Sequence, residues 1–215
     1  MRPGIKSNGP KPLSFIEEAR RKQIVDTAIK TIAQRGLSQA SLAEIARKAG
    51  ISKGVISYHF NGKEELIEEI LACLLREPAA FIKERVGREE TALGRLRAYI
   101  EANLDFMAAY RDGYVALVDL WGSHGVSGGK RRFSAEAYEP SRRYLSRILE
   151  EGQRSGEFRK FPIDVAASLA QAAIDGIMLQ WVFDPDAIDL KVASAEIVEM
   201  VTAYVLPTKI RRHER

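Results

Sequence analysis

The sequence predicts an all-α protein of about nine helices, and three features of the chain support this prediction. Apolar residues recur at three- and four-residue steps through most of the 215 residues, as they do along one face of a helix. Breaks at Gly36, Gly50 and Asn61-Gly62 separate these segments. Two of the segments, between residues 41 and 63, are very short. The pattern therefore divides the chain into an N-terminal unit of three helices and a larger helical part.

The first 35 residues are expected to form an arm and one amphipathic helix. Residues 1–14 carry three prolines and two glycines and predict a flexible basic arm. Such an arm either has no role or reaches into a DNA minor groove, and both alternatives stay open. The first helix is expected over residues 15–35, where Ile24, Ala28 and Ile32 recur every four residues.

The stretch at 41–63 reads SLAEIARKAGISKGVISYHFNGK and predicts two short helices joined by a turn. Leu42 and Ile45 give the first helix an apolar face, and Gly50 permits the tight turn that follows it. The hydroxyl of Ser52 can cap the second helix. This is the sequence form of a helix-turn-helix, in which the second helix enters the major groove of DNA.

Small, polar and cationic residues on and around the second short helix are the expected DNA contacts, because base edges and phosphates require such side chains. Lys53 and Lys63 are assigned mainly to phosphates. Val55, Ser57 and Tyr58 are candidates for base or thymine-methyl contact, and phosphate is an alternative partner for Tyr58. The full set is Ser41, Ser52, Lys53, Gly54, Val55, Ser57, Tyr58, His59 and Lys63.

Charge is distributed unevenly along the chain. Residues 1–63 contain twelve Lys and Arg against four Asp and Glu, a net charge of +8, whereas the remaining residues carry −4. The basic part is the part with the helix-turn-helix. The asymmetry therefore indicates a polyanion partner for the N-terminal part alone, and double-stranded DNA is the expected one.

Cysteine usage and hydropathy bear on the expected location. The single cysteine, Cys73, excludes an internal disulfide and is expected to be a small buried hydrophobe. No N-terminal stretch has the pattern of a signal peptide, and the apolar runs are expected to be too short to cross a bilayer, which takes about 20 residues. We expect a soluble cytoplasmic protein without a membrane partner.

At the helix-turn-helix the sequence resembles the TetR family of bacterial transcriptional regulators. The resemblance covers about the first third of the chain, includes Arg35-Gly36 before the motif, and continues through Lys63-Glu64-Glu65-Leu66. Later resemblance is confined to two phrases, from Glu150 to Phe158 and from Asp175 to Asp184. Many members carry a tyrosine pair where this chain has Ser57-Tyr58, so one usual DNA-contacting aromatic is absent. The resemblance implies a fourth helix that links the DNA-binding domain to a helical body.

The expected domains are a flexible basic arm at 1–14, a helix-turn-helix DNA-binding domain at 15–62, a helical regulatory and dimerisation domain at 63–207, and a basic tail at 208–215. A flexible loop, GVSGGK, is expected at 125–130. Helices after the motif are expected at 63 to about 75, 89–110, 114–123, 133–154, 163–183 and 190–205.

The last two expected helices are apolar on more than one side. A helix of this kind is buried by more than its own domain, and the alanines allow close helix approach. This predicts a homodimer built on four helices, which the family resemblance also implies, and a thick monomeric core is the alternative. The expected interface residues are Leu169, Ala173, Ile177, Val198, Val201 and Val205.

An unidentified small molecule is the expected second partner. Large side chains on helices that need not all fit in a tight core are the candidate pocket residues, with His124 and Asp175 able to orient a polar group. For each residue alone, ordinary core packing is the alternative. The candidates are Phe106, Tyr110, Trp121, His124, Tyr138, Asp175, Met178 and Trp181.

No pattern of residues predicts an enzyme, a metal site or a cofactor. The histidines at 59, 124 and 213 lack metal-ligand spacing. GVSGGK is not a phosphate loop, because His124 stands at the first glycine position and Arg131 follows Lys130. The expected function is a ligand-responsive transcriptional regulator, a repressor that binds an inverted-repeat operator as a dimer and is released by a small molecule. The alternative is a DNA-bound structural or interaction protein with the same helix-turn-helix and no effector.

Overall fold

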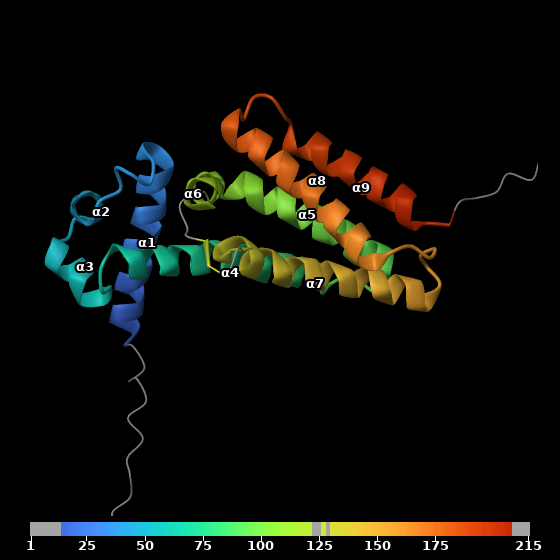
Figure 1. Ribbon diagram of the computed structural model, residues 1–215, viewed down its shortest axis with the longest axis horizontal. Helices are drawn as coiled ribbons and strands as arrows, with labels where there is room; N and C mark the ends of the chain where they lie inside the picture. The colour runs from blue at the N-terminus through green and yellow to red at the C-terminus, as the bar shows by residue number, and fades with distance from the viewer. Residues whose placement is uncertain (1–13, 122–125, 128–129, 208–215) are drawn as a thin grey trace, which may run out of the picture. The chain divides into compact units, whose positions relative to one another are not determined.

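The computed structural model describes residues 14–121, 126–127 and 130–207 (Figure 1). These residues form nine helices, α1 to α9, and one pair of very short strands. They divide into two compact units on either side of the Ile70–Leu71 bond. We call residues 14–70 the head and residues 71–207 the body. Most of the expected arm and the whole expected tail lie outside the described residues.

The head contains α1 (Phe15–Arg35), α2 (Leu42–Ala49), α3 (Lys53–His59) and the first turns of α4 (Lys63–Val86). Ser14 caps α1 in a capping box with Glu17, which satisfies two backbone donors at the helix start. The bounds of α1, α2 and α3 confirm the helix expected at 15–35 and the two short helices that follow it. Their core consists of aliphatic side chains that are almost completely buried: Ile24, Ala28, Ile32, Ile45 and Ile56.

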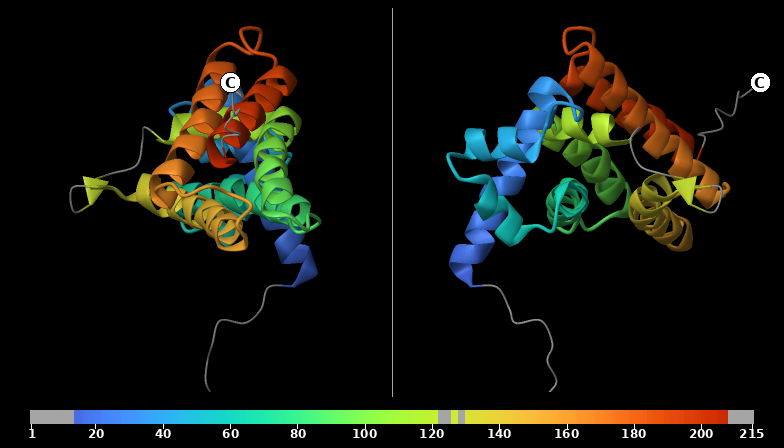
Figure 2. Two further views of the ribbon diagram at one scale, coloured as in Figure 1. Left: turned by 90° about the vertical axis from the view of Figure 1, so that its right-hand side faces the viewer. Right: turned by 60° about the vertical axis from the view of Figure 1, so that its left-hand side comes forward.

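The body contains the rest of α4, α5 (Ala92–Ala109), α6 (Arg111–Trp121), α7 (Arg132–Ser155), α8 (Ile163–Phe183) and α9 (Leu190–Val205). Helix α5 packs against α7 and α9, and α8 packs against α6, α7 and α9. Figures 1 and 2 show α8 and α9 as neighbouring helices joined by a short loop. The bounds expected for α8 and α9 are confirmed.

Two helices, α4 and α6, differ from their expected bounds at a proline or a glycine. Helix α4 continues through Pro78 to Val86, because the apolar face continues with Ile82 and Val86, which are buried, and this outweighs the hydrogen bond that a proline removes. Helix α6 begins at Arg111 and includes Gly113. A Cβ atom on Gly113 would lie 2.4 Å from the ring of Tyr110, so only glycine fits this turn.

The expected loop at 125–130 contains regular structure. Strand β1 (Val126–Ser127) pairs antiparallel with β2 (Lys130–Arg131), and α7 follows directly. The loop prediction thus missed this pair of strands.

Among the described residues, α8 is long and apolar enough to cross a membrane by length and composition, contrary to the expectation that every apolar run is too short. Core helices of soluble proteins pass the same test. Contacts with α6, α7 and α9 account for one face of α8, and its other face is described with the dimer candidates below.

Candidate DNA interface and effector cavity

Helix α3 is fixed by a cap and one buried side chain and leaves most of its other residues exposed. The Oγ atom of Ser52 accepts a hydrogen bond from the N–H of Val55 at 3.3 Å. Ile56 is completely buried and anchors the helix against the head. Four of the expected DNA residues within α3 are exposed, Lys53, Gly54, Ser57 and Tyr58, whereas Val55 and His59 are half-buried.

The turn between α2 and α3 depends on Gly50, whose φ of 67° is in the left-handed region that favours glycine. Ser41 caps α2 by accepting from the N–H of Glu44 at 3.1 Å. Because a capping hydroxyl uses a lone pair, both Ser41 and Ser52 retain a hydrogen that can be donated to a phosphate.

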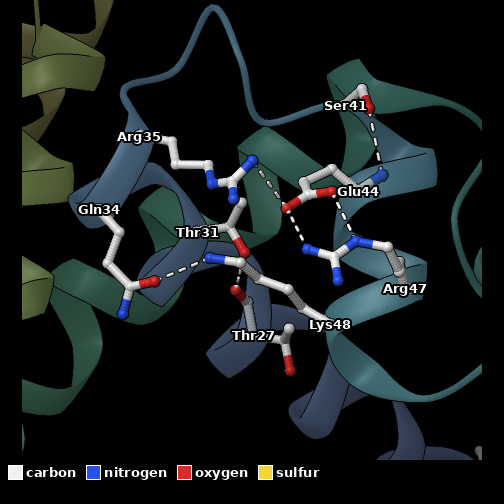
Figure 3. Close-up of polar contacts among 8 residues, drawn as sticks. All are labelled: Thr27, Thr31, Gln34, Arg35, Ser41, Glu44, Arg47 and Lys48. Carbon is white, nitrogen blue, oxygen red and sulfur yellow. Dashed lines mark hydrogen bonds and ion pairs between the residues drawn. The ribbon is translucent and has the colours of Figure 1, made fainter.

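Glu44 joins α1 to α2 through two arginines (Figure 3). Its carboxylate accepts from Nε and Nη2 of Arg47, at 2.9 and 2.8 Å, and lies 3.2 Å from Nη1 of Arg35. The bond from Arg47 is the main cause of a lowered pKa for Glu44, so the carboxylate is ionised at neutral pH. Lys48 adds a second link by donating to Gln34 at 2.8 Å.

Arg21 holds the C-terminal end of α3, a role that the sequence did not suggest. It donates to the carbonyl of His59, lies 3.5 Å from the carboxylate of Glu69, and places its guanidinium 4.2 Å from the ring centre of Phe60. Desolvation and the charge of Arg21 lower the pKa of His59, which favours the neutral imidazole. The end of α3 and the start of α4 therefore share one arginine.

Two of the expected DNA contacts are engaged within the head. The hydroxyl of Tyr58 donates to Oε1 of Glu17 at 3.1 Å, and its ring lies edge-on to His59 at 5.0 Å. The ammonium of Lys63 donates to the carbonyl of Leu37 at 3.1 Å. All nine expected residues lie in the head, but Tyr58 and Lys63 already form hydrogen bonds there, with Glu17 and with the carbonyl of Leu37.

The body contains a cavity of about 100 Å³ lined by residues from α4 to α8. Three of the expected effector residues line it: Trp121, Asp175 and Met178. Other lining residues were not expected from the sequence, among them Leu74, Pro78, Asn103, Tyr114, Ser141 and Gln171. No group of His, Cys, Asp and Glu among the described residues has the arrangement of a metal site.

A chain of hydrogen bonds orients the acidic side of this cavity. The hydroxyl of Tyr99 donates to Oε1 of Gln171 at 2.7 Å, and Nε2 of Gln171 donates to Oδ1 of Asp175 at 2.9 Å. Burial, and then the charge of Asp175, raises the pKa of Tyr114, so its phenol stays neutral. Gln171 and Asp175 are four residues apart on the mostly apolar α8, and this polar pair is the signal that could have identified Gln171.

The remaining expected effector residues do not line the cavity or lie outside the description. The ring of Phe106 packs on those of Phe81 and Tyr110, at 5.4 and 5.7 Å between centroids. Trp181 is buried with the guanidinium of Arg111 5.7 Å from its ring centre. Phe106, Tyr110 and Trp181 thus pack against neighbouring side chains, with Phe106 and Tyr110 half-buried. His124 and the side chain of Tyr138 are outside the described residues.

The outer face of α8 and α9 exposes large apolar side chains. Val165, Leu169 and Phe183 on α8 are 54%, 60% and 75% exposed, and Val192 and Met200 on α9 are 59% and 55% exposed. Two expected interface residues are not on this face. Val201 and Val205 are buried within the body, because the side of α9 that carries them packs inward.

The fold and these sites define a helix-turn-helix transcriptional regulator with a helical body. Residues 24–70 match the family model described as bacterial regulatory proteins, tetR family, and residues 92–206 match the BetI-type transcriptional repressor, C-terminal. The chain belongs to the tetR family of bacterial regulatory proteins. It is a ligand-responsive DNA-binding regulator, and the alternative without an effector is not favoured.

Relatives with known names or structures are similar over most of the chain. The HTH-type transcriptional regulator BetI of Paraburkholderia phymatum is 31% identical over 183 residues, covering 85% of this chain and 91% of the relative. A putative regulator from Saccharomonospora viridis in complex with choline has a TM-score of 0.78 at 22% identity, covering 88% and 99% of the two chains. FadR from Bacillus subtilis, in complex with stearoyl-CoA, has a TM-score of 0.73 at 24% identity, covering 85% and 97%.

Proposed function

We propose that this protein is a cytoplasmic repressor without catalytic activity that binds an inverted-repeat operator as a homodimer and is released by a small molecule. The observation that carries the proposal is α3, a capped helix with Ile56 buried and its polar residues exposed. One such short helix contacts only a few base pairs, so a specific site needs two of them, related by the symmetry of a dimer.

The proposed DNA contacts are the nine residues expected from the sequence. Lys53 is exposed and available for a phosphate, whereas Lys63 has to leave the carbonyl of Leu37 or share its ammonium with it. Val55 and Ser57 are the proposed base contacts.

The proposed dimer interface is the outer face of α8 and α9. Leu169, Ala173, Ile177 and Val198 remain in the set, and Val165 and Val192 replace the buried valines. A Cβ on Gly176 would meet no atom of the chain within 4 Å, which leaves room for close approach of another helix. Exposed apolar side chains of this number on two adjacent helices support association with a second copy.

The proposed effector is a small organic cation. Among the described lining residues, Asp175 is the one charged group, and Tyr114 and Trp121 offer aromatic rings that attract cations. The choline complex of the Saccharomonospora viridis protein agrees with this chemistry. Stearoyl-CoA, the ligand of the Bacillus subtilis protein, agrees less well with this cavity. The cavity of about 100 Å³ is small for it, and the carboxylate of Asp175 repels the phosphates of coenzyme A.

Helix α4 is the proposed route from effector to DNA. It carries Lys63 in the head and, on the same continuous helix, Leu74, Leu75 and Pro78 of the cavity lining. A ligand shifts an equilibrium only by its different affinity for two states, so the effector must fit the DNA-incompetent state better. A coupling of about 1–3 kcal/mol would lower operator affinity by roughly 5- to 150-fold.

The DNA half of the proposal is tested by selecting binding sites from random duplexes with the purified protein. We expect an enriched inverted repeat whose half-sites are separated by one or more helical turns. Equal affinity for selected and random duplexes would contradict it.

The effector half is tested with choline and stearoyl-CoA as probes. We expect choline to raise the unfolding temperature and weaken operator binding, and stearoyl-CoA to do neither. Asp175→Asn should abolish the choline effect because it removes the counter-charge, while Asp164→Asn, on the same helix but outside the cavity lining, should retain it. A choline response that is unchanged in Asp175→Asn would contradict the assignment.

A further inference from the structure

The most exposed large side chain of α3 is attached to another helix. Tyr58 is 74% exposed, yet its hydroxyl donates a hydrogen bond of 3.1 Å to Oε1 of Glu17, in the first turn of α1. The two residues are 41 positions apart in the sequence, so the contact is a product of the fold of the head.

The carboxylate of Glu17 is held in place independently of Tyr58. Its Oε2 atom accepts from both the backbone N–H and the hydroxyl of Ser14, each at 2.8 Å. The backbone bond from Ser14 is the main cause of a lowered pKa for Glu17, with smaller contributions from the Ser14 hydroxyl and Tyr58. The positive end of the α1 dipole also favours the charge. Glu17 therefore presents a fixed, ionised acceptor to Tyr58.

A tyrosine hydroxyl has one hydrogen to donate. Phosphate oxygens, like carboxylate oxygens, only accept, so Tyr58 cannot donate to Glu17 and to a DNA phosphate at the same time. In addition, the charge of Glu17 repels phosphates near Tyr58. Both effects oppose the use of Tyr58 in DNA binding.

We propose that Glu17 is a positioning residue that competes with the DNA phosphate for the hydroxyl hydrogen of Tyr58 and thereby lowers the DNA affinity of the head. This inference rests on the proposed contact between Tyr58 and DNA. It identifies an acidic residue on α1 as a determinant of affinity, although α3 is the helix assigned to the major groove.

The variant Glu17→Gln tests the competition, since glutamine retains the capping box and can donate to Tyr58 rather than only accept from it. We expect it to raise duplex affinity roughly 2- to 12-fold, the range of one net hydrogen bond. In a Tyr58→Phe background the same substitution should give a smaller gain, the part due to the lost charge alone. An equal gain in both backgrounds, or no gain in the first, would overturn the proposal.

Glu18→Gln is the matched control. Glu18 is exposed in the same helical turn as Glu17, and its substitution removes the same charge. Its effect should be identical with and without the hydroxyl of Tyr58. The phosphate contact is independent of sequence, so the comparison works on random as well as selected duplexes. Failure to select an operator would thus reject the regulatory proposal without deciding this one.

A measurement without DNA tests the contact itself. In protein labelled with ¹³C at tyrosine Cζ, the resonance of Tyr58 should follow the acid titration of Glu17, because protonation weakens the bond. The resonance should not follow this titration in Glu17→Gln. A Tyr58 resonance that is flat over the same pH range in the wild-type protein would overturn the inference.

Discussion

Individual side chains around α3 either hold the helix in place or remain exposed for a partner. Ile56 and Arg21 belong to the first group, since one is buried and the other donates to the carbonyl of His59. Lys53 and Ser57 belong to the second group. If the exposed residues contact DNA as proposed, we expect single substitutions to alter DNA binding and folding of the head independently.

Lys53→Ala should weaken binding without changing the preferred sequence, because a phosphate contact carries no base information. The slope of log affinity against log salt should fall in magnitude by about 0.9 for each phosphate that the variant no longer neutralises. Titration of the selected duplex at several salt concentrations measures both effects. Relaxed preference at one base pair would instead identify Lys53 as a base contact.

Glu44→Gln should destabilise the head at neutral pH and have less effect in acid. The pKa of Glu44 is lowered by folding, so its contribution to stability is present above its usual value of 4.5 and is lost as the pH falls through the folded value. Denaturant unfolding of both proteins at pH 7 and near pH 3.5 measures this. A stability difference that is the same at both pH values would contradict the role of the arginine contacts.

At the scale of helices, a glycine near the end of α7 permits close packing of an aromatic ring. Gly152 of α7 lies against Phe158, whose N–H donates to the carbonyl of Gly152 at 2.9 Å, and a Cβ there would lie 2.1 Å from the ring. Phe158 is buried, so the ring has little room to move. This contact gives a physical reason for the family-like phrase from Glu150 to Phe158.

Gly152→Ala should destabilise the body by about 1–3 kcal/mol through overpacking. Gly54→Ala in α3 is the control, because its Cβ would make only an ordinary contact, 3.6 Å from Oγ of Ser52, and alanine favours a helix by up to about 1 kcal/mol over glycine. Thermal unfolding followed by circular dichroism should therefore shift in opposite directions for the two variants. Equal shifts of the unfolding temperature would show that the contact with Phe158 does not restrict the side chain at position 152.

Periodicity predicted the helices well where side chains alone determine the pattern, as in α1, α8 and α9. It failed at Pro78 and Gly113, which usually end helices, because tertiary packing of Ile82 and of the Tyr110 ring decides those positions. The same limit applies to the cavity. Aromatic size and apolar pattern cannot separate a lining residue such as Trp121 from a packed one such as Phe106.

At the scale of the whole molecule, the chain leaves one large apolar face without a partner of its own. Leu169 on α8 and Met200 on α9 belong to it, and both are more than half exposed. Their exposure supports the proposed dimer over the alternative of a thick monomeric core, which would bury them.

Leu169→Arg should convert the proposed dimer to monomers that remain folded, because an unpaired charge is costly in an interface but not on an exposed surface. Operator affinity should fall much more than affinity for random duplexes. Sedimentation and circular dichroism measure the two properties. Glu90→Arg, at an exposed site before α5, is the control, and wild-type monomers at micromolar concentration would contradict the dimer.

Pro78 gives α4 a defined point of low bending stiffness. Residue 78 has no N–H to donate to the carbonyl of Leu74, so one backbone hydrogen bond is missing from an otherwise regular helix. Leu74 and Pro78 both line the cavity, so an effector bound there, as proposed, would contact the helix where the least energy is needed to bend it. We therefore expect a small ligand at this point to change the direction of the helix more readily than a ligand bound elsewhere along it.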